Sequence, residues 1–224
     1  QSDPDETVNL AADGASRETK ERLSRVLDEH LLAIRDVDFA PEPILRTLSD
    51  TPYEFGHDDA RYPLWKVLET AGLAASLASE ATPSLVERTN DGDASVRYWA
   101  TLGIYMRGRD AVLSHLQTLR ARMSDDEPIV RVVAAQALAT YGTEDDVPGA
   151  VEALLTYADV SNNEVTLAAH ALNALDYLDG IALPYLDEIK ALPTDTSDVE
   201  QRYRSYVPRI LDKTLADLES ASRD

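Results

Sequence analysis

Cysteine is absent from the 224 residues of this chain, and aromatic residues are scarce. Without a thiol, the chain has no disulfide, no thiolate metal site and no cysteine nucleophile. Aromatic residues make up only 6% of the chain, so alanine and leucine dominate the apolar set, which suits packed helices better than a β-sandwich. No apolar run approaches the roughly 18 residues of a membrane span. The start shows no signal-peptide pattern, and the compartment stays open.

Positive charge is also scarce. Lys and Arg together number 21 against 41 Asp and Glu, a formal net charge of −20. Such a surface repels phosphates and anionic lipid, so we expect neither nucleic acid nor membrane as a partner. Only four lysines are present, Lys20, Lys66, Lys190 and Lys213. Adaptation to high salt and an arginine-preferring genome explain this pattern equally well.

A motif recurs at a spacing of 34 residues. Arg97 aligns with Arg131, and Ala134-Ala-Gln-Ala-Leu138 aligns with Ala168-Ala-His-Ala-Leu172. Repeats of this length in a helical pattern predict an all-α solenoid, in which antiparallel helix pairs stack and bury one continuous core.

The apolar periodicity and the positions of Pro and Gly predict the helices. Ser16 is the expected N-cap of the first helix. Residues 36–62 contain several prolines and read as an irregular connector, with a short helix possible at 44–48. We therefore divide the chain into an N-terminal segment, 1–62, and a repeat domain, 63–224. The expected helices cover residues 17–35, 63–78, 82–89, 93–107, 109–123, 127–141, 146–158, 163–178, 182–192 and 197–219.

Two arginines occupy the same repeat position, each four residues after an acid. Asp93 precedes Arg97 and Glu127 precedes Arg131, a spacing that brings opposite charges together on one helix face. We hypothesise that each arginine also reaches the acidic loop of an adjacent repeat, which would form a ladder along the stack. Val165 stands at this position in the third copy, so the ladder would stop there. Together with Tyr98 and Trp99, these four charged residues are the interaction candidates.

No set of residues in the sequence indicates a reaction centre. The histidines at 30, 57, 115 and 170 lack metal-ligand spacing, and structural roles are favoured for them. Aspartate pairs at 58–59, 125–126 and 145–146 resemble solvated acids at helix starts more than a calcium loop, with His57-Asp58-Asp59 the best of these candidates. Neither a Gly-x-Ser-x-Gly nucleophile motif nor a glycine-rich phosphate loop is present.

The repeat residues resemble a known class. Asp93-x-x-Val-Arg97 and Pro128-x-Val-Arg131-x-x-Ala-Ala-x-Ala-Leu138 look like HEAT-type repeats, especially the short PBS-lyase-like kind, over roughly residues 63–190. The resemblance implies a scaffold and says little about activity.

The first residues carry a second resemblance. Ser2-Asp-Pro-Asp-Glu-Thr-Val-Asn-Leu-Ala11 looks like a stretch that follows the last catalytic-domain strand in sulfatases of the alkaline-phosphatase superfamily. Thr51-Pro-Tyr-Glu54 and Arg61-Tyr-Pro-Leu64 resemble the tail of a subgroup of these enzymes that carries HEAT-like repeats. The family's catalytic domain uses a divalent cation, usually Ca²⁺, and a formylglycine made in a Cys/Ser-x-Pro-x-Arg motif. Glu6 stands where that motif needs Arg, so no catalytic residue transfers to this chain.

These resemblances imply a non-catalytic C-terminal region of a sulfatase, in which residues 1–35 pack against the catalytic domain of the same polypeptide. We expect no enzyme activity and no cofactor in this chain itself. The repeats would then act as a scaffold, a cleft rim or an oligomer contact. An anionic substrate would need a cluster of arginines, for which Arg97, Arg107, Arg109, Arg120 and Arg122 are the candidates. The alternative is a free-standing HEAT-repeat adaptor that binds a protein partner through its concave face.

Overall fold

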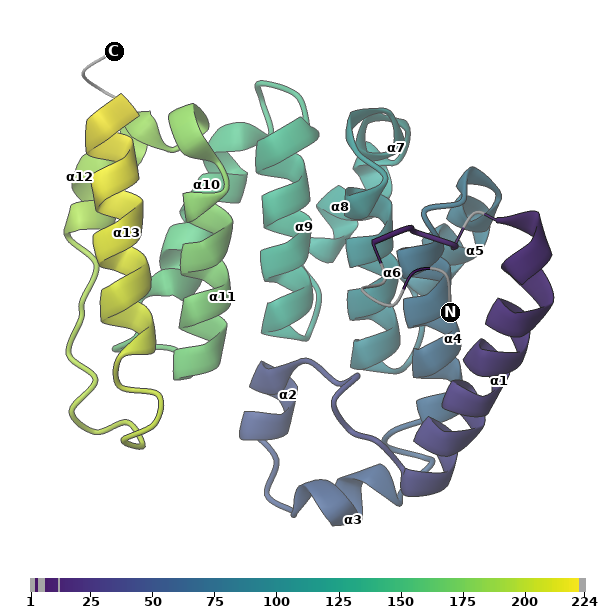
Figure 1. Ribbon diagram of the computed structural model, residues 1–224. Coiled ribbons are helices and arrows are strands. Elements are labelled where there is room, and N and C mark those ends of the chain that lie inside the picture. Colours follow the sequence, from purple (N-terminus) through teal and green to yellow (C-terminus); the bar gives the residue numbers. More distant parts are fainter. Residues whose placement is uncertain (1–2, 4–6, 12, 222–224) are drawn as a thin grey trace.

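The computed structural model describes residues 3, 7–11 and 13–221, and this part of the chain contains helices and no strands (Figure 1). The expected all-α solenoid is confirmed. Of the stretch that resembles a sulfatase, residues 2, 4, 5 and 6 lie outside the described residues.

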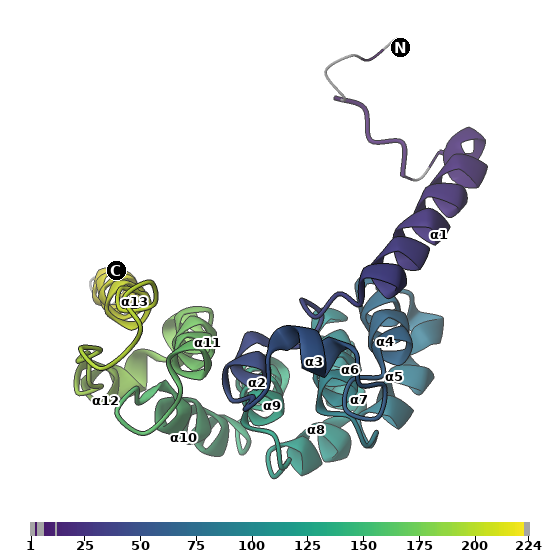
Figure 2. The ribbon, with the colours of Figure 1, turned by 90° about the horizontal axis from the view of Figure 1, so that it is seen from below.

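The helices form two layers of an arc. Seen from below, the arc is open on the side of α11 and α13 and closed on the side of α8, α10 and α12 (Figure 2). The inner layer contains α4 (Leu64–Ser76), α6 (Ala94–Met106), α9 (Pro128–Tyr141), α11 (Val165–Asp176) and α13 (Tyr206–Ala221). The outer layer contains α5 (Thr82–Arg88), α7 (Arg109–Ser114), α8 (Leu116–Arg122), α10 (Val147–Ala158) and α12 (Leu186–Lys190).

The inner helices are buried by their neighbours on either side. In α9, Ile129, Val130, Ala134 and Ala135 are fully buried between α6 and α11. One apolar cluster extends from Ala74 in α4 to Leu218 in α13. Small alanines at the contacts let neighbouring helices approach closely, as the repeat pattern predicts.

The arc is less compact than a typical globular chain. Its accessible surface is 12637 Å², whereas a compact monomer of this mass exposes about 10,100 Å². The excess reflects an elongated stack with a projecting helix, which leaves more surface available for partners.

Residues 36–62 are more ordered than the sequence predicts. They form two short helices, α2 (Glu42–Arg46) and α3 (Pro52–Gly56), and α3 begins with a capping box in which Thr51 and Glu54 bond to each other's backbone amides. α2 packs against α11. Phe55 and Tyr62 share a small core cluster with Val67 and Val96. The division at residues 62 and 63 stays a prediction, and this cluster spans it.

Three predicted helices differ from the structure. The helix expected at 109–123 is split into α7 and α8 at His115, whose φ of −127° and ψ of 28° interrupt the helix. The helix expected at 182–192 is a 3₁₀ turn followed by α12. The helix expected at 197–219 begins only at Tyr206, because Thr196 and Arg204 close the preceding residues into a loop through bonds to backbone carbonyls.

The first helix stands apart from the arc. α1 (Arg17–Ile34) projects from the side of α4 and buries none of its residues (Figure 2). Ser16 stands at the N-cap position of α1, as predicted, but its side chain forms no capping hydrogen bond. Its hydroxyl instead donates to Asp13, which caps the preceding 3₁₀ turn (Gly14–Ser16). The helix ends at Arg35, which has a left-handed φ of 57° and donates to the Gly56 carbonyl.

Gly103 tests the close approach of α4 and α6. A methyl group at this position would lie 2.9 Å from Ala74 Cβ and 2.9 Å from Leu85 Cδ1. We expect Gly103→Ala to lower the free energy of unfolding by about 1–3 kcal/mol in urea denaturation. The matched control is Gly72→Ala in α4, where nothing lies within 4 Å and the gain in helix propensity is up to about 1 kcal/mol. Equal effects of both changes would contradict close packing at Gly103.

Candidate functional site

The loops that precede three inner helices share one construction. Asp91, Asp125 and Asp159 stand 34 residues apart, and each carboxylate accepts a hydrogen bond from the amide two residues later, at 3.0, 2.9 and 2.9 Å. These turns fix the chain just before α6 and α9 and five residues before the N-cap of α11. The inner helices therefore begin along one edge of the arc, where α2 also lies (Figure 1).

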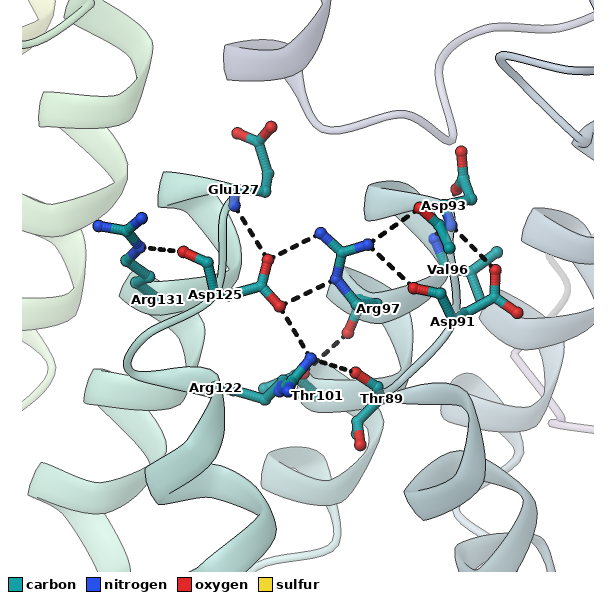
Figure 3. Close-up of polar contacts among 11 residues, drawn as sticks. Thr89, Asp91, Asp93, Val96, Arg97, Thr101, Arg122, Asp125, Glu127 and Arg131 are labelled. Carbon is teal, nitrogen blue, oxygen red and sulfur yellow. Dashed lines mark hydrogen bonds and ion pairs between the residues drawn. The ribbon is translucent and has the colours of Figure 1, made fainter.

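Asp125 is the hub of this edge. Its side chain is only 1% exposed and accepts two hydrogen bonds from Arg97, at 2.9 and 2.8 Å, and one from Arg122 at 3.0 Å (Figure 3). Arg97 lies in α6 and Asp125 in the loop before α9, so this fork joins successive repeats. Paired guanidinium–carboxylate contacts of this kind are among the stronger polar interactions in proteins.

Each candidate arginine also bonds to the loop before its own helix. Arg97 donates to the carbonyl oxygens of Asp91 and Gly92, at 2.9 and 3.1 Å. Arg131 donates to the Asp125 carbonyl in the same way, and its Nη1 donates to the Tyr157 hydroxyl at 2.9 Å. Arg97 thus joins two loops, whereas Arg131 joins its own loop to α10.

The expected pairs within a helix are replaced by other contacts. Arg97 forms its ion pair with Asp125, and Asp93 instead caps α6 by accepting from the Val96 amide at 2.9 Å. Glu127 stands at the N-cap position of α9, and its amide donates to Asp125. Upstream, Lys66 of α4 forms an ion pair with Asp91, so a cation on the preceding inner helix holds each of the first two loops.

Burial and hydrogen bonding shift the pKa values of these carboxyl groups in opposite directions. Burial alone would raise the pKa of Asp125, but the bonds from Arg97 and from the Glu127 amide leave it below its ordinary value. Burial raises the pKa of both Asp93 and Glu127. Asp125 is therefore stabilised as the charged partner of the two arginines.

The aromatic candidates hold the connector in place. Trp99 Nε1 donates to the Phe39 carbonyl at 2.8 Å, and its ring lies 6.4 Å from that of Phe39. Tyr98 meets Trp99 edge to face at 5.5 Å, and burial raises the pKa of Tyr98. The structure thus brings Trp99 against the segment before α2 and away from the Asp125 hub.

The five arginines considered for anion binding do not form a patch. Arg97 and Arg122 pair with Asp125, and Arg120 pairs with Asp146 at 2.7 Å. Arg107 donates to the carbonyls of Leu73, Ala74, Ala78 and Gly103 and so closes the C-terminal end of α4. Of the five, only Arg109 is exposed, and within the described part of the chain its side chain forms no hydrogen bond or ion pair.

The residues considered for a metal site have other contacts. His57 stacks on Tyr53 at 4.0 Å and its Nδ1 lies 2.8 Å from the Tyr53 carbonyl oxygen, whereas Asp59 pairs with Arg35. Over residues 3, 7–11 and 13–221, no group of three His, Asp or Glu side chains converges as metal ligands. Within the same residues, no helix combines the length and apolar character that crossing a bilayer requires.

An exposed apolar surface lies on α1. Leu23, Val26, Leu27 and Ile34 are each 53–55% exposed and follow helical spacing along one face. Leu10 lies beside this face and lines with it a groove of about 520 Å³. A stripe of this kind on a helix that buries none of its own residues indicates a docking surface.

The comparisons agree with the architecture. Residues 82–173 match the family model for HEAT repeats, which covers α5 to α11. The chain carries HEAT-like repeats. A search of curated proteins found no match. The HEAT-like segment contains the Asp125 hub and all three aspartate turns.

The sequence does not predict the hub. The aspartate pair at 125–126 resembles solvated acids at a helix start, whereas Asp125 is 4% exposed. The signal was present, because Asp91, Asp125 and Asp159 keep the repeat spacing more strictly than the arginines do. An acid that recurs at every loop of a stack indicates a loop-forming role.

Arg97→Ala tests the hub. The change leaves the buried Asp125 carboxylate with fewer partners, and we expect the free energy of unfolding to fall by about 3 kcal/mol. Arg109→Ala removes the same charge from an exposed site and should change it by less than about 0.5 kcal/mol. Urea denaturation at neutral pH measures both. An Arg97→Ala protein as stable as the control would contradict the hub.

The low pKa of Asp146 predicts that the free energy of unfolding depends on pH. Hydrogen bonds from Arg120 and Thr143 lower its pKa to about 2, against 3.8 for a free side chain. Because the folded pKa is the lower one, its stabilisation is complete above pH 4 and is lost as pH falls toward 2. We expect about 2 kcal/mol from this group.

Unfolding of the parent, Asp146→Asn and Asp145→Asn proteins across pH 2–6 measures this contribution. The gap between the parent and Asp146→Asn should close as pH falls, whereas the exposed Asp145 should produce almost no gap at any pH. A gap for Asp146→Asn that stays constant with pH would rule out the assigned shift.

Proposed function

We propose that this chain is a non-catalytic interaction scaffold and that it forms the C-terminal region of a sulfatase. The observation that supports the scaffold role is the division of its surface. The charged repeat residues Arg97 and Arg131 bond inside the chain, whereas the apolar stripe of α1 stays exposed. HEAT-like repeats present surfaces of this kind to macromolecular partners.

The sulfatase parentage rests on the sequence resemblance of residues 2–11, 51–54 and 61–64. In that architecture the catalytic domain precedes the repeats and hydrolyses sulfate esters with a divalent cation and a formylglycine. This chain contributes no catalytic residue and binds no cofactor. Its α1 stripe, centred on Leu27, packs against the catalytic domain and fixes the position of the arc beside the cleft.

A free-standing adaptor is the second candidate. The observation that favours it is the open concave side of the arc, lined by α11 and α13 (Figure 2). In this function a protein partner binds inside the arc, and the α1 stripe contacts the same or another protein.

Leu27→Asp tests the docking role of α1. Since Leu27 is 55% exposed and α1 buries no residue, the change should alter the stability of this chain alone by less than about 0.5 kcal/mol. In the protein that contains the catalytic domain, the same change should lower the melting temperature and separate the two parts in limited proteolysis. Glu21→Asp, on the polar face, is the matched control.

The parentage is tested by the reading frame and by activity. An in-frame upstream Cys/Ser-x-Pro-x-Arg motif supports the sulfatase, and an initiator Met directly before Gln1 supports the adaptor. This chain alone should hydrolyse an aryl sulfate no faster than buffer. If the purified chain still hydrolyses the aryl sulfate after contaminating enzymes have been removed, the non-catalytic role is overturned.

A further inference from the structure

A second surface lies at the C-terminal end of the arc. Asn173 of α11 and Tyr206, Arg209 and Lys213 of α13 line a groove of about 500 Å³. Both helices belong to the inner layer, which lines the concave side of the arc (Figure 2). It is separate from α1, and its properties do not depend on whether α1 meets a catalytic domain.

One short stretch beside the groove lacks acidic residues. Residues 201–211 contain Arg202, Arg204 and Arg209 and no acidic residue, in a chain of net charge −20. Most other arginines of the arc are paired with carboxylates, as at Asp125 and Asp146. A guanidinium without a carboxylate partner in this stretch therefore offers an anion a contact that most of the surface lacks.

Arg209 is the cation available to a ligand. It is exposed, and within the described part of the chain its side chain forms no ion pair, whereas Lys213 is held by Asp176 and Asp217 at 2.7 Å each. Arg202 pairs with Glu200, and Arg204 donates to the Val199 carbonyl. Arg209 thus lines the groove without an acidic partner, beside Lys213, whose charge is balanced by two aspartates.

α11 offers groups suited to a peptide in and beside the groove. Asn173 lines the groove, and Tyr177, four residues later at the C-cap of α11, is 71% exposed. An asparagine amide both donates to and accepts from a peptide backbone. Tyrosine rings, here Tyr177 and the 40% exposed Tyr206, cover aliphatic segments of a partner at a low entropy cost.

We propose that the groove between α11 and α13 binds an extended acidic peptide segment of a partner protein. A carboxylate of the segment pairs with Arg209, its backbone bonds to Asn173, and Tyr206 and Tyr177 cover the side chains on either side. The net charge of the chain alone predicts tighter binding of basic peptides. Tighter binding of acidic peptides would therefore distinguish a local site from the overall charge.

Fluorescence anisotropy with labelled ten-residue peptides tests the proposal on the full 224-residue chain. The probes are an alternating glutamate–alanine peptide and the matching lysine–alanine peptide, at physiological ionic strength. We expect the glutamate peptide to bind more tightly. Arg209→Glu should weaken its binding by about tenfold or more, the effect of losing one charge-assisted contact. Arg109→Glu makes the same charge change on the outer layer and should alter binding less than about twofold.

Three results would overturn the proposal. The first is tighter binding of the lysine peptide, which would mean that the overall charge decides. The second is equal weakening by Arg209→Glu and Arg109→Glu, and the third is no binding of the glutamate peptide. Arg209→Lys keeps the charge and should retain most of the affinity, which separates a local contact from a folding defect. Leu27→Asp on α1 should leave the affinity unchanged, so a failure here does not bear on the parentage of the chain.

Discussion

Mutual burial of neighbouring helices is the constraint on which this structure depends. An amphipathic helix of 12 to 14 residues such as α9 or α11 is only marginally stable alone. Its stability comes from packing against the helices before and after it, and the cluster from α4 to α13 shows that this packing is continuous. The arc therefore resembles a chain of nearest-neighbour contacts, in which each repeat stabilises the next.

Polar contacts along one edge complement this core. The aspartate turns fix the loops, and Arg97 joins two of them through the buried Asp125 carboxylate. Farther along the same edge, Arg46 of α2 reaches Glu164 and Glu200 and stacks on Tyr203. The connector thus ties the middle of the arc to its C-terminal end, which positions α13 and the groove beside it.

Much of the fold could be predicted from the sequence because helical periodicity and the 34-residue repeat report directly on packing. The inner helices, except for the start of α13, lie within a few residues of their predicted ranges. The errors fall where local signals compete. His115 splits a helix that its apolar pattern continues, and side-chain bonds from Thr196 and Arg204 hold residues before Tyr206 in a loop. The burial of Asp125 depends on its partner 28 residues away, which charge patterns alone do not identify.

The two proposed binding surfaces lie outside the contacts that hold the repeats together. Inside the repeats, alanines and paired arginines are used for stacking, so surfaces for partners are left on α1 and in the concave groove. Hydrogen exchange of the free chain tests this account most directly. It predicts strong protection of α6, α9 and α11 amides and exchange of α1 amides close to the rate of an isolated peptide helix. Protection of α1 equal to that of α9 would contradict it.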